Sequence, residues 1–184
     1  MARKDQRKPI LRILLLLSLI TSPLFAKPVT VERVKKASNT FLKAENVRVE
    51  KQLQALATNE IQKESPKGFT IAGVKEIRSD GKVVAYVTEL EPEGFIITAA
   101  DTDIRPILGY SFRGKFPYED SKQNALLHLV RADVEARLKA LSAGVKEQRA
   151  SMASNNELWT RYSDTDETLV QTLSSATQWP DPAQ

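Results

Sequence analysis

The sequence predicts an α+β fold, in which a three- to four-stranded antiparallel sheet packs with an N-terminal helix and a long C-terminal helix. Two patterns predict it. Apolar residues recur every three or four positions over 29–44 and 120–149, which is the helical period. Between them, residues 69–112 hold short runs rich in Val, Ile, Tyr and Thr, separated by turn residues, as expected for strands. A sheet of this kind needs one face covered, and the flanking helices can cover it.

The first helix is predicted over residues 29–44, with Thr30 as its N-cap. The next segment, Asn46 to Ala57, is ambiguous. Val47 and Val49 alternate as in a strand, whereas the later apolar residues follow helical spacing. The predicted apolar stripe of the first helix is Val34, Ala37, Phe41 and Ala44.

Four strands are predicted after this helix. The first two, 69–78 and 82–90, flank Asp80-Gly81, a dipeptide that favours a tight hairpin. Glu91-Pro92-Glu93-Gly94 predicts the next turn, because Pro comes early and Gly late. The third and fourth strands are predicted over 95–100 and 107–112, on either side of a polar loop.

The C-terminal helix is predicted over 120–149. Asp120 is a candidate N-cap, and Gln123, three residues later, would complete a capping box. Gly144 is expected to weaken the last turns. The predicted core stripe is Leu127, Val130, Val134, Leu138, Leu141 and Val145. Beyond it, residues 155–162 are expected to form a short helical piece that holds Trp159, and the remainder of 151–184 is interpreted as a linker or tail.

The N-terminal segment, 1–26, has the layout of a secretory signal peptide. A basic stretch precedes the apolar run 10–20, and a small residue, Ala26, stands at the expected cleavage position. The alternative is an uncleaved anchor. The leader holds five of the 27 basic and one of the 23 acidic residues, which leaves 22 of each sign. The mature protein is therefore expected to be secreted, extracellular or periplasmic, to meet the membrane only during export, and to bind no nucleic acid, which requires a basic surface.

Residue types exclude most catalytic chemistry. The chain has no Cys, which excludes a Cys nucleophile. A Ser-based set could draw only on His128, which lies within a predicted helix and is interpreted as an ordinary helix residue, and no Gly-x-Ser-x-Gly motif is present. The same counts leave no transition-metal cluster, and scattered glycines form no phosphate loop, so neither metal nor cofactor is expected. Four carboxylates near turns are interpreted as turn chemistry: Glu91, Glu93, Asp101 and Asp103. An enzyme is thus the weakest hypothesis.

A Gly-Phe strand at residues 94–95 leads into a turn with Asp101, and a Leu-Gly-Tyr-Ser strand at 108–111 and a Gly-x-Phe turn at 114–116 follow. This ordered set of motifs resembles the core of streptopain-family propeptides, which also occurs as small inhibitors of those proteases. The resemblance covers roughly residues 29–150 and is most specific over 84–127. Most of these positions are expected to serve the fold. They are Gly94, Phe95, Asp101, Leu108, Gly109, Tyr110, Ser111, Gly114 and Phe116.

The resemblance implies an inhibitory domain over 27–150 that packs beside the active site of a papain-like cysteine protease. In the family, an Asn near the start of the helix after the sheet enters the cleft and disturbs the catalytic His. Lys122, Gln123 and Asn124 fall at that place here. With a helix that starts at Asp120, Asn124 is expected one turn in, on the polar side with His128.

Two questions stay open at this point. The partner would be met in trans by a free inhibitor, or in cis if the chain is a truncated precursor whose segment 151–184 leads toward a protease domain. The alternative function is a non-enzymatic periplasmic or extracellular α+β binding or structural domain without a protease partner.

Overall fold

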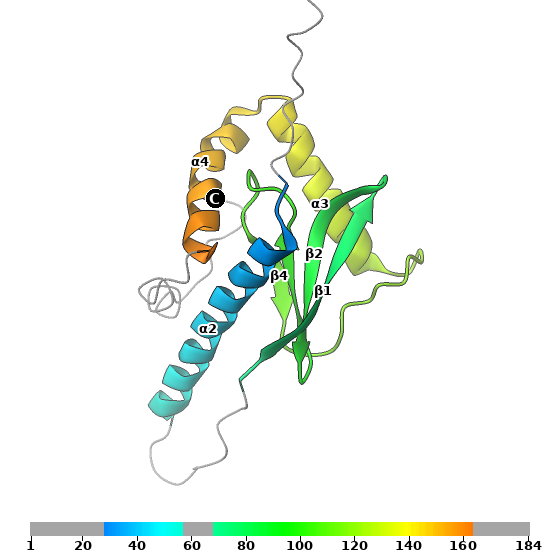
Figure 1. The fold of residues 1–184 in the computed structure, drawn as a ribbon. Helices are drawn as coiled ribbons and strands as arrows, with labels where there is room; N and C mark the ends of the chain where they lie inside the picture. The colour runs from blue at the N-terminus through cyan, green and yellow to red at the C-terminus, as the bar shows by residue number, and fades with distance from the viewer. Residues whose placement is uncertain (1–27, 57–67, 164–184) are drawn as a thin grey trace, which may run out of the picture.

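A computed structural model describes residues 28–56 and 68–163, with the backbone alone at 49–56, 148 and 149 (Figure 1). The described residues form one four-stranded sheet and three helices, which confirms the predicted α+β fold. In chain order the elements are α2 (Val31–Leu56), β1 (Thr70–Ser79), β2 (Lys82–Glu91), β3 (Phe95–Ala99), β4 (Ile107–Ser111), α3 (Ala125–Ser142) and α4 (Lys146–Ser163).

Helix α2 begins where the sequence predicts. The hydroxyl of Thr30 accepts a hydrogen bond from the backbone N–H of Arg33 at 3.3 Å, as an N-cap does. The predicted apolar stripe is buried, and Val34 and Phe41 are wholly inaccessible to solvent. The ambiguous segment from Asn46 continues this helix to Leu56, while Ala57 lies outside the described residues.

The sheet is an antiparallel meander with strand order β1-β2-β3-β4. Asp80 and Gly81 form the two-residue hairpin turn between Ser79 and Lys82, and both have positive φ, 47° and 76°. A turn of this kind matches the twist of the strands it joins, which explains why Asp-Gly predicted it. All four predicted strands are confirmed, and no strand boundary differs from the predicted one by more than one residue.

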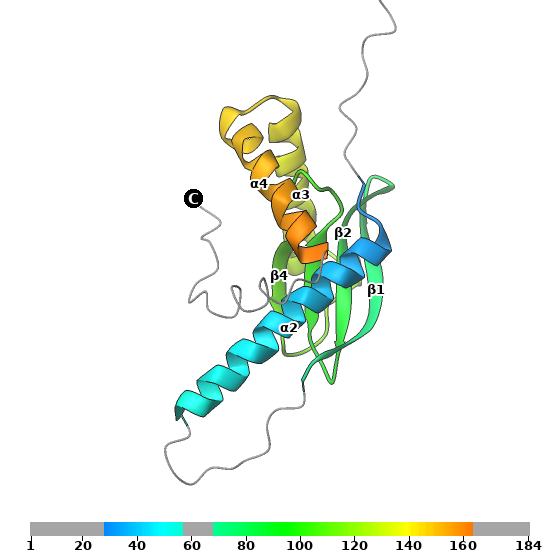
Figure 2. The same cartoon turned by 60° about the vertical axis from the view of Figure 1, so that its left-hand side comes forward.

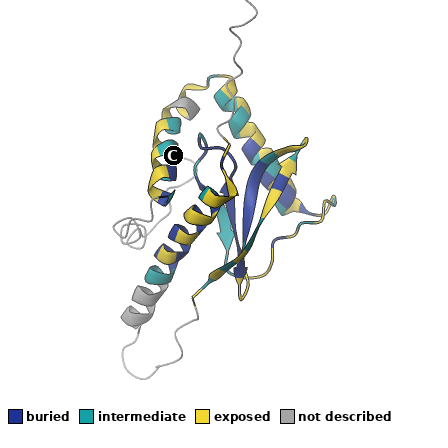
Figure 3. Cartoon of the chain, in the orientation of Figure 1, coloured by how far each residue is buried: buried dark blue, intermediate teal, exposed yellow. Residues whose placement is uncertain are grey.

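Helices cover both faces of the sheet. Figure 2 shows α2 crossing in front of the strands, Figure 1 shows α3 lying behind them, and Figure 3 shows the resulting burial. Strand β3 is therefore buried at all five positions instead of alternating. On the α2 side, the hydroxyls of Ser38 and Thr88 share a buried hydrogen bond of 2.8 Å. This bond satisfies both groups inside the core.

The predicted start of the C-terminal helix is wrong. Helix α3 begins at Ala125, and Asn124 is its N-cap, so Asp120 and Gln123 form no capping box. Asp120 instead lies exposed in the preceding loop, where its carboxylate pairs with Arg131 at 2.9 Å. The apolar stripe is confirmed where it meets the sheet, because Leu127, Val130 and Val134 are buried.

A second helix, α4, replaces the predicted continuation to residue 149. Gly144 follows the end of α3 with φ of 76°, and its N–H donates to the carbonyl of Leu141 at 3.1 Å. A glycine of positive φ commonly ends a helix in this way. Helix α4 then contains the predicted helical piece around Trp159, whose side chain is fully buried. The folded domain therefore extends beyond the predicted boundary at 150, to Ser163, and the rest of the predicted tail lies outside the described residues.

Residues just after the predicted leader are joined to the fold. Pro28 forms a β-bridge with Asp101, and the N–H of Val29 donates to the carbonyl of Ala100 at 3.0 Å. The Tyr86 hydroxyl donates to the carbonyl of Val29, also at 3.0 Å. The predicted cleavage position, Ala26, lies outside the described residues. Within 28–56 and 68–163, no helix has the length and apolarity needed to span a bilayer.

Candidate functional site

The Gly motifs bring the turn after β2 against the end of β4. Gly94 has φ of 113°, and a Cβ there would lie only 2.6 Å from the carbonyl oxygen of Ser111. The N–H of Gly94 donates to the carbonyl of Gly114 at 2.8 Å, and the N–H of Gly114 donates to the Glu93 carboxylate, also at 2.8 Å. Gly94 is thus required by a close backbone approach, which fixes where the loop after β4 begins.

The remaining motif residues also serve the fold. Phe95 and Phe116 are both buried and meet edge to face, with ring centroids 5.3 Å apart, a favoured geometry for aromatic pairs. The carboxylate of buried Asp101 accepts a hydrogen bond from the N–H of Asp103 at 2.8 Å. On β4, the ring of Tyr110 lies 4.9 Å from that of Phe41 of α2. Half-buried Leu108, Gly109 and Ser111 complete the strand.

Asn124 organises the loop that leads into α3. Its Nδ2 donates to two carbonyls, those of Pro117 and Glu119, each at 2.8 Å. Its Oδ1 accepts from the N–H of Leu127 at 3.1 Å. The residue is 8% exposed, so the expectation that it projects from the solvated side of the helix is wrong. Both the donor and the acceptor of the amide are engaged, which makes Asn124 a positioning residue within this chain.

A cluster of Lys75, Glu89 and Tyr118 joins the sheet to the same loop. Lys75 of β1 pairs with the Glu89 carboxylate at 2.9 Å, and its ammonium lies 4.3 Å from the ring centre of Tyr118, within the range of a cation–π contact. The hydrogen bond from Lys75 lowers the pKa of Glu89. Burial, and then the Glu89 carboxylate, raise the pKa of Tyr118. The loop before α3 is therefore held at two points: Tyr118 contacts Lys75 of the sheet, and Asn124 bonds to two carbonyls of the loop.

Exposed side chains gather at the start of α3. Lys122 and Gln123 are exposed directly before the helix, and His128 is exposed on its first turn, with Nε2 3.0 Å from the carbonyl oxygen of Ser121. Leu129 follows with 65% of its surface exposed. We call Lys122, Gln123, His128 and Leu129 the α3 N-terminal surface. Sequence reasoning missed Leu129, although its position outside the buried stripe is the signal that could have found it.

The site offers binding chemistry. Three of the four carboxylates considered as catalytic candidates are engaged in turns and loops: Glu93 with Gly114, Asp101 with Asp103, and Asp103 with the amide of Asn156 at 3.0 Å. Within the described part of the chain, no three His, Asp or Glu side chains cluster as metal ligands would. A firmly supported loop with an exposed apolar, cationic and amide surface is suited to contact another protein.

The described residues form a small α+β domain with an exposed surface at the start of α3. A family model described as Spi protease inhibitor matches residues 26–135, more than half of the chain. The chain belongs to this family of protease inhibitors. Comparisons with curated proteins and with solved structures found no match. The matched region ends inside α3, so α4 is a part of the folded domain that the family model does not include.

Proposed function

We propose that this chain inhibits a papain-like cysteine protease of the streptopain type through its α3 N-terminal surface. Membership of a protease-inhibitor family supports inhibition. The choice of protease rests on the ordered motif from Gly94 to Phe116, which resembles streptopain-family propeptides. The observation that carries the choice of surface is the loop of residues 112–124, which is anchored by Asn124 and Tyr118 and leaves Lys122 and Gln123 exposed.

The α3 N-terminal surface could block the active-site cleft of a protease by binding alone, without catalytic groups. The Gln123 amide offers two donors and an acceptor, which suit cleft backbone or an imidazole, and Lys122 adds a positive charge. Leu129 supplies an apolar contact, whose burial favours association. Because the amide of Asn124 is already bonded within the loop, its neighbours Lys122 and Gln123 make the contact, and Asn124 holds them in place.

We propose in addition that the chain is exported and that its leader is removed. Cleavage after Ala26 would leave Lys27 as the first residue, directly before the anchored Pro28 and Val29. Mass spectrometry of the exported protein measures this N-terminus, and an intact Met1 would contradict it. The partner is met in trans by a free inhibitor or in cis by a precursor, and no cofactor takes part.

Inhibition constants test the target and the surface together. The parent protein should inhibit a streptopain-type protease and leave trypsin active. The double variant Lys122→Ala/Gln123→Ala should weaken inhibition about tenfold to a hundredfold, the effect expected for central contact residues. Its melting temperature should stay unchanged because both side chains are exposed.

Lys139→Ala is the matched control, since it removes an exposed Lys from the far end of the same helix. Inhibition of trypsin alone would reject the cysteine-protease target. A folded parent that inhibits neither enzyme would favour the alternative, a secreted binding domain without a protease partner of this kind.

A further inference from the structure

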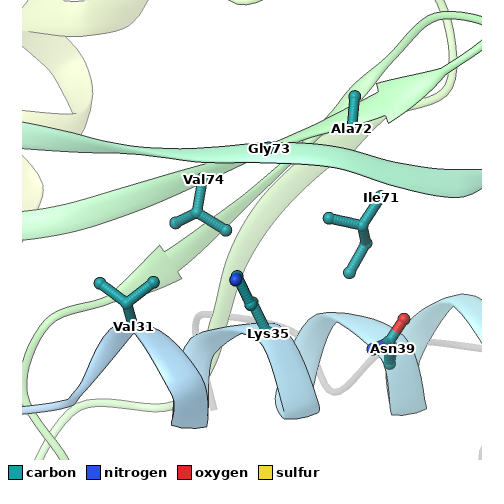
Figure 4. Close-up of a pocket in the computed structure, with 7 residues that line it drawn as sticks. All are labelled: Val31, Lys35, Asn39, Ile71, Ala72, Gly73 and Val74. Atoms are coloured by element: carbon teal, nitrogen blue, oxygen red, sulfur yellow. The ribbon is translucent and has the colours of Figure 1, made fainter.

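A groove of about 420 Å³ lies between α2 and the edge strand β1, away from α3. Figure 4 shows three side chains of the helix pointing up toward Ile71 and Val74, which point down from the strand across the groove. Three aliphatic side chains supply apolar surface: Val31, Ile71 and Val74. The other lining residues are Lys35, Asn39, Ala72 and Gly73.

A bulge shapes the strand side of this groove. The pairing of β1 with β2 shifts register between Ile71 and Gly73. In a regular strand, side chains three positions apart point to opposite faces. Here Ile71 and Val74 both point toward α2 (Figure 4). The bulge therefore places two aliphatic side chains side by side above the helix.

The backbone beside the groove is open to pairing. β1 is the outermost strand, so one side of it has no partner strand within the described residues. Natural proteins often block such edges with charge. Lys75, Glu76 and Arg78 do so for the second half of β1, and Arg78 pairs with Glu76 at 2.6 Å. The first half, residues 70–74, carries no charge and borders the groove.

Gly73 lies in this uncharged half, and the fold does not require a glycine there. Its φ lies outside the left-handed region, and the nearest atom to an added Cβ would be a Glu89 carboxylate oxygen at 3.6 Å, an ordinary contact. Glycine within a strand often marks a bulge, and the register shift beside Gly73 is such a bulge. With no side chain at this position, another backbone can also approach β1 closely.

The helix side of the groove specifies the side chains of that chain. Lys35 is the single charged residue that lines the groove, and within the described residues it forms no ion pair. Val31, Lys35 and Asn39 are spaced four residues apart, about 6 Å along the helix. Alternate residues of an extended chain are about 6.6 Å apart, so three inward side chains match the three helix positions.

We propose that β1 and this groove bind an extended segment of a partner polypeptide as a fifth strand. The segment places a carboxylate over Lys35 and an aliphatic side chain beside Val31, Ile71 and Val74. Its backbone pairs with β1 at residues 70–74, as in other cases of strand addition. The site is separate from the α3 N-terminal surface and does not rest on the proposed inhibition.

Fluorescence polarisation with two labelled probes tests the proposal. The acidic probe is Ac-Val-Thr-Asp-Thr-Val-amide, which reads alike in either strand direction, and the basic probe has Lys in place of Asp. The parent protein should bind the acidic probe more tightly. Lys35→Glu should weaken that binding about tenfold and reverse the preference between the probes, since a facing attraction becomes a repulsion.

Two controls isolate the site. Lys36→Glu makes the same charge change on the next, exposed residue of α2. That residue is turned about 100° away, so the change should leave binding of both probes nearly unchanged. Two further acidic probes carry N-methyl groups, each on one of the two alternating sets of amides. At least one of them should fail to bind, because strand pairing needs the N–H groups of one set.

Several outcomes would overturn the proposal. These are no binding of the acidic probe up to about 1 mM, equal effects of Lys35→Glu and Lys36→Glu, or full binding of every methylated probe. A parent that is dimeric by light scattering and becomes monomeric with Lys35→Glu would assign the edge to a second copy of this chain, and would also reject a partner segment.

Discussion

The Oδ1 atom of Asn124 accepts a hydrogen bond from the backbone N–H of Leu127, while its Nδ2 atom holds two carbonyls of the preceding loop. One side chain therefore caps α3 and closes the loop. This double use explains why Asn124 is buried between exposed neighbours, Gln123 and Ala125.

Asn124→Ala should lower the free energy of unfolding by about 1–3 kcal/mol, because a helix cap is lost and carbonyls are left without their donor. Asn124→Asp keeps the cap acceptor and loses both donors, so its melting temperature should fall between those of the parent and the Ala variant. Gln123→Ala is the exposed control and should melt like the parent. Unchanged melting of Asn124→Ala would contradict the assigned role.

Two glycines of the motif should differ in their tolerance of a side chain. Both have positive φ, but a Cβ at Gly94 would meet the Ser111 carbonyl, whereas a Cβ at Gly114 would meet no atom within 4 Å. Gly114→Ala should cost about 1–2 kcal/mol, the usual penalty for the left-handed conformation. Gly94→Ala should cost more, since the backbone must also move. Denaturant unfolding measures both, and equal costs would show that the contact at Gly94 is relieved easily.

Trp159 should be needed for the stability of the domain. Its ring is fully buried, and Nε1 donates to the carbonyl of Ile104 at 2.8 Å. Trp159→Ala should cost about 3–5 kcal/mol through the lost ring volume. Trp159→Phe keeps most of the ring and leaves that carbonyl unpaired, for about 1–3 kcal/mol. The measurement is chemical unfolding followed by circular dichroism.

A deletion gives an independent test of the domain boundary. Protein ending at Ala150 should melt well below protein ending at Ser163, because it lacks the side chains of α4 that enter the core. Equal melting of the two would restore the boundary at 150 and make α4 an appendage.

Glu45 should make stability depend on pH. Only 4% of the residue is exposed, and burial raises its pKa, although Arg48, 3.0 Å away, opposes this. The pKa of this carboxyl group is therefore higher in the folded state than in the unfolded state, where it is 4.5. Such a group stabilises the fold at pH values below 4.5, and this contribution is lost as the pH rises through the folded-state pKa. Glu45→Gln should therefore raise the melting temperature at pH 7 and have a smaller effect at pH 4. Exposed Glu157→Gln is the control, and a loss of stability at pH 7 would show that the pair with Arg48 outweighs burial.

Local signals in the sequence predicted most of the fold. The Asp-Gly turn and the buried stripes of α2 and α3 depend on neighbours within a few residues, so periodicity and turn chemistry were enough. The start of α3 was not predictable in this way. Asp120 and Asn124 are both good caps, and the choice depends on carbonyls that the folded loop brings to the Asn124 amide.

Helix α4 was predicted only in part, as a short helical piece at 155–162. Its sequence is polar, and among its described side chains just Trp159 and Tyr162 are buried, so periodicity is weak. The contacts that define α4 come from far along the chain. Lys122 and Gln123 were predicted in the first turn of a helix that starts at Asp120, but they lie exposed before α3. The burial of Asn124, between them and the helix, depends on contacts that the folded loop supplies.

The contact between α2 and α4 has a consequence for synthesis. The Thr40 hydroxyl donates to the carbonyl of Tyr162 at 2.8 Å, and the Arg33 guanidinium lies over the Trp159 ring and donates to Ser163 at 3.1 Å. Helix α2, the first helix of the domain to be synthesised, thus packs against α4, the last helix that the structure describes. A nascent chain that ends before Trp159 leaves that side of α2 uncovered, so the domain completes its fold only after the ribosome has moved well beyond α3.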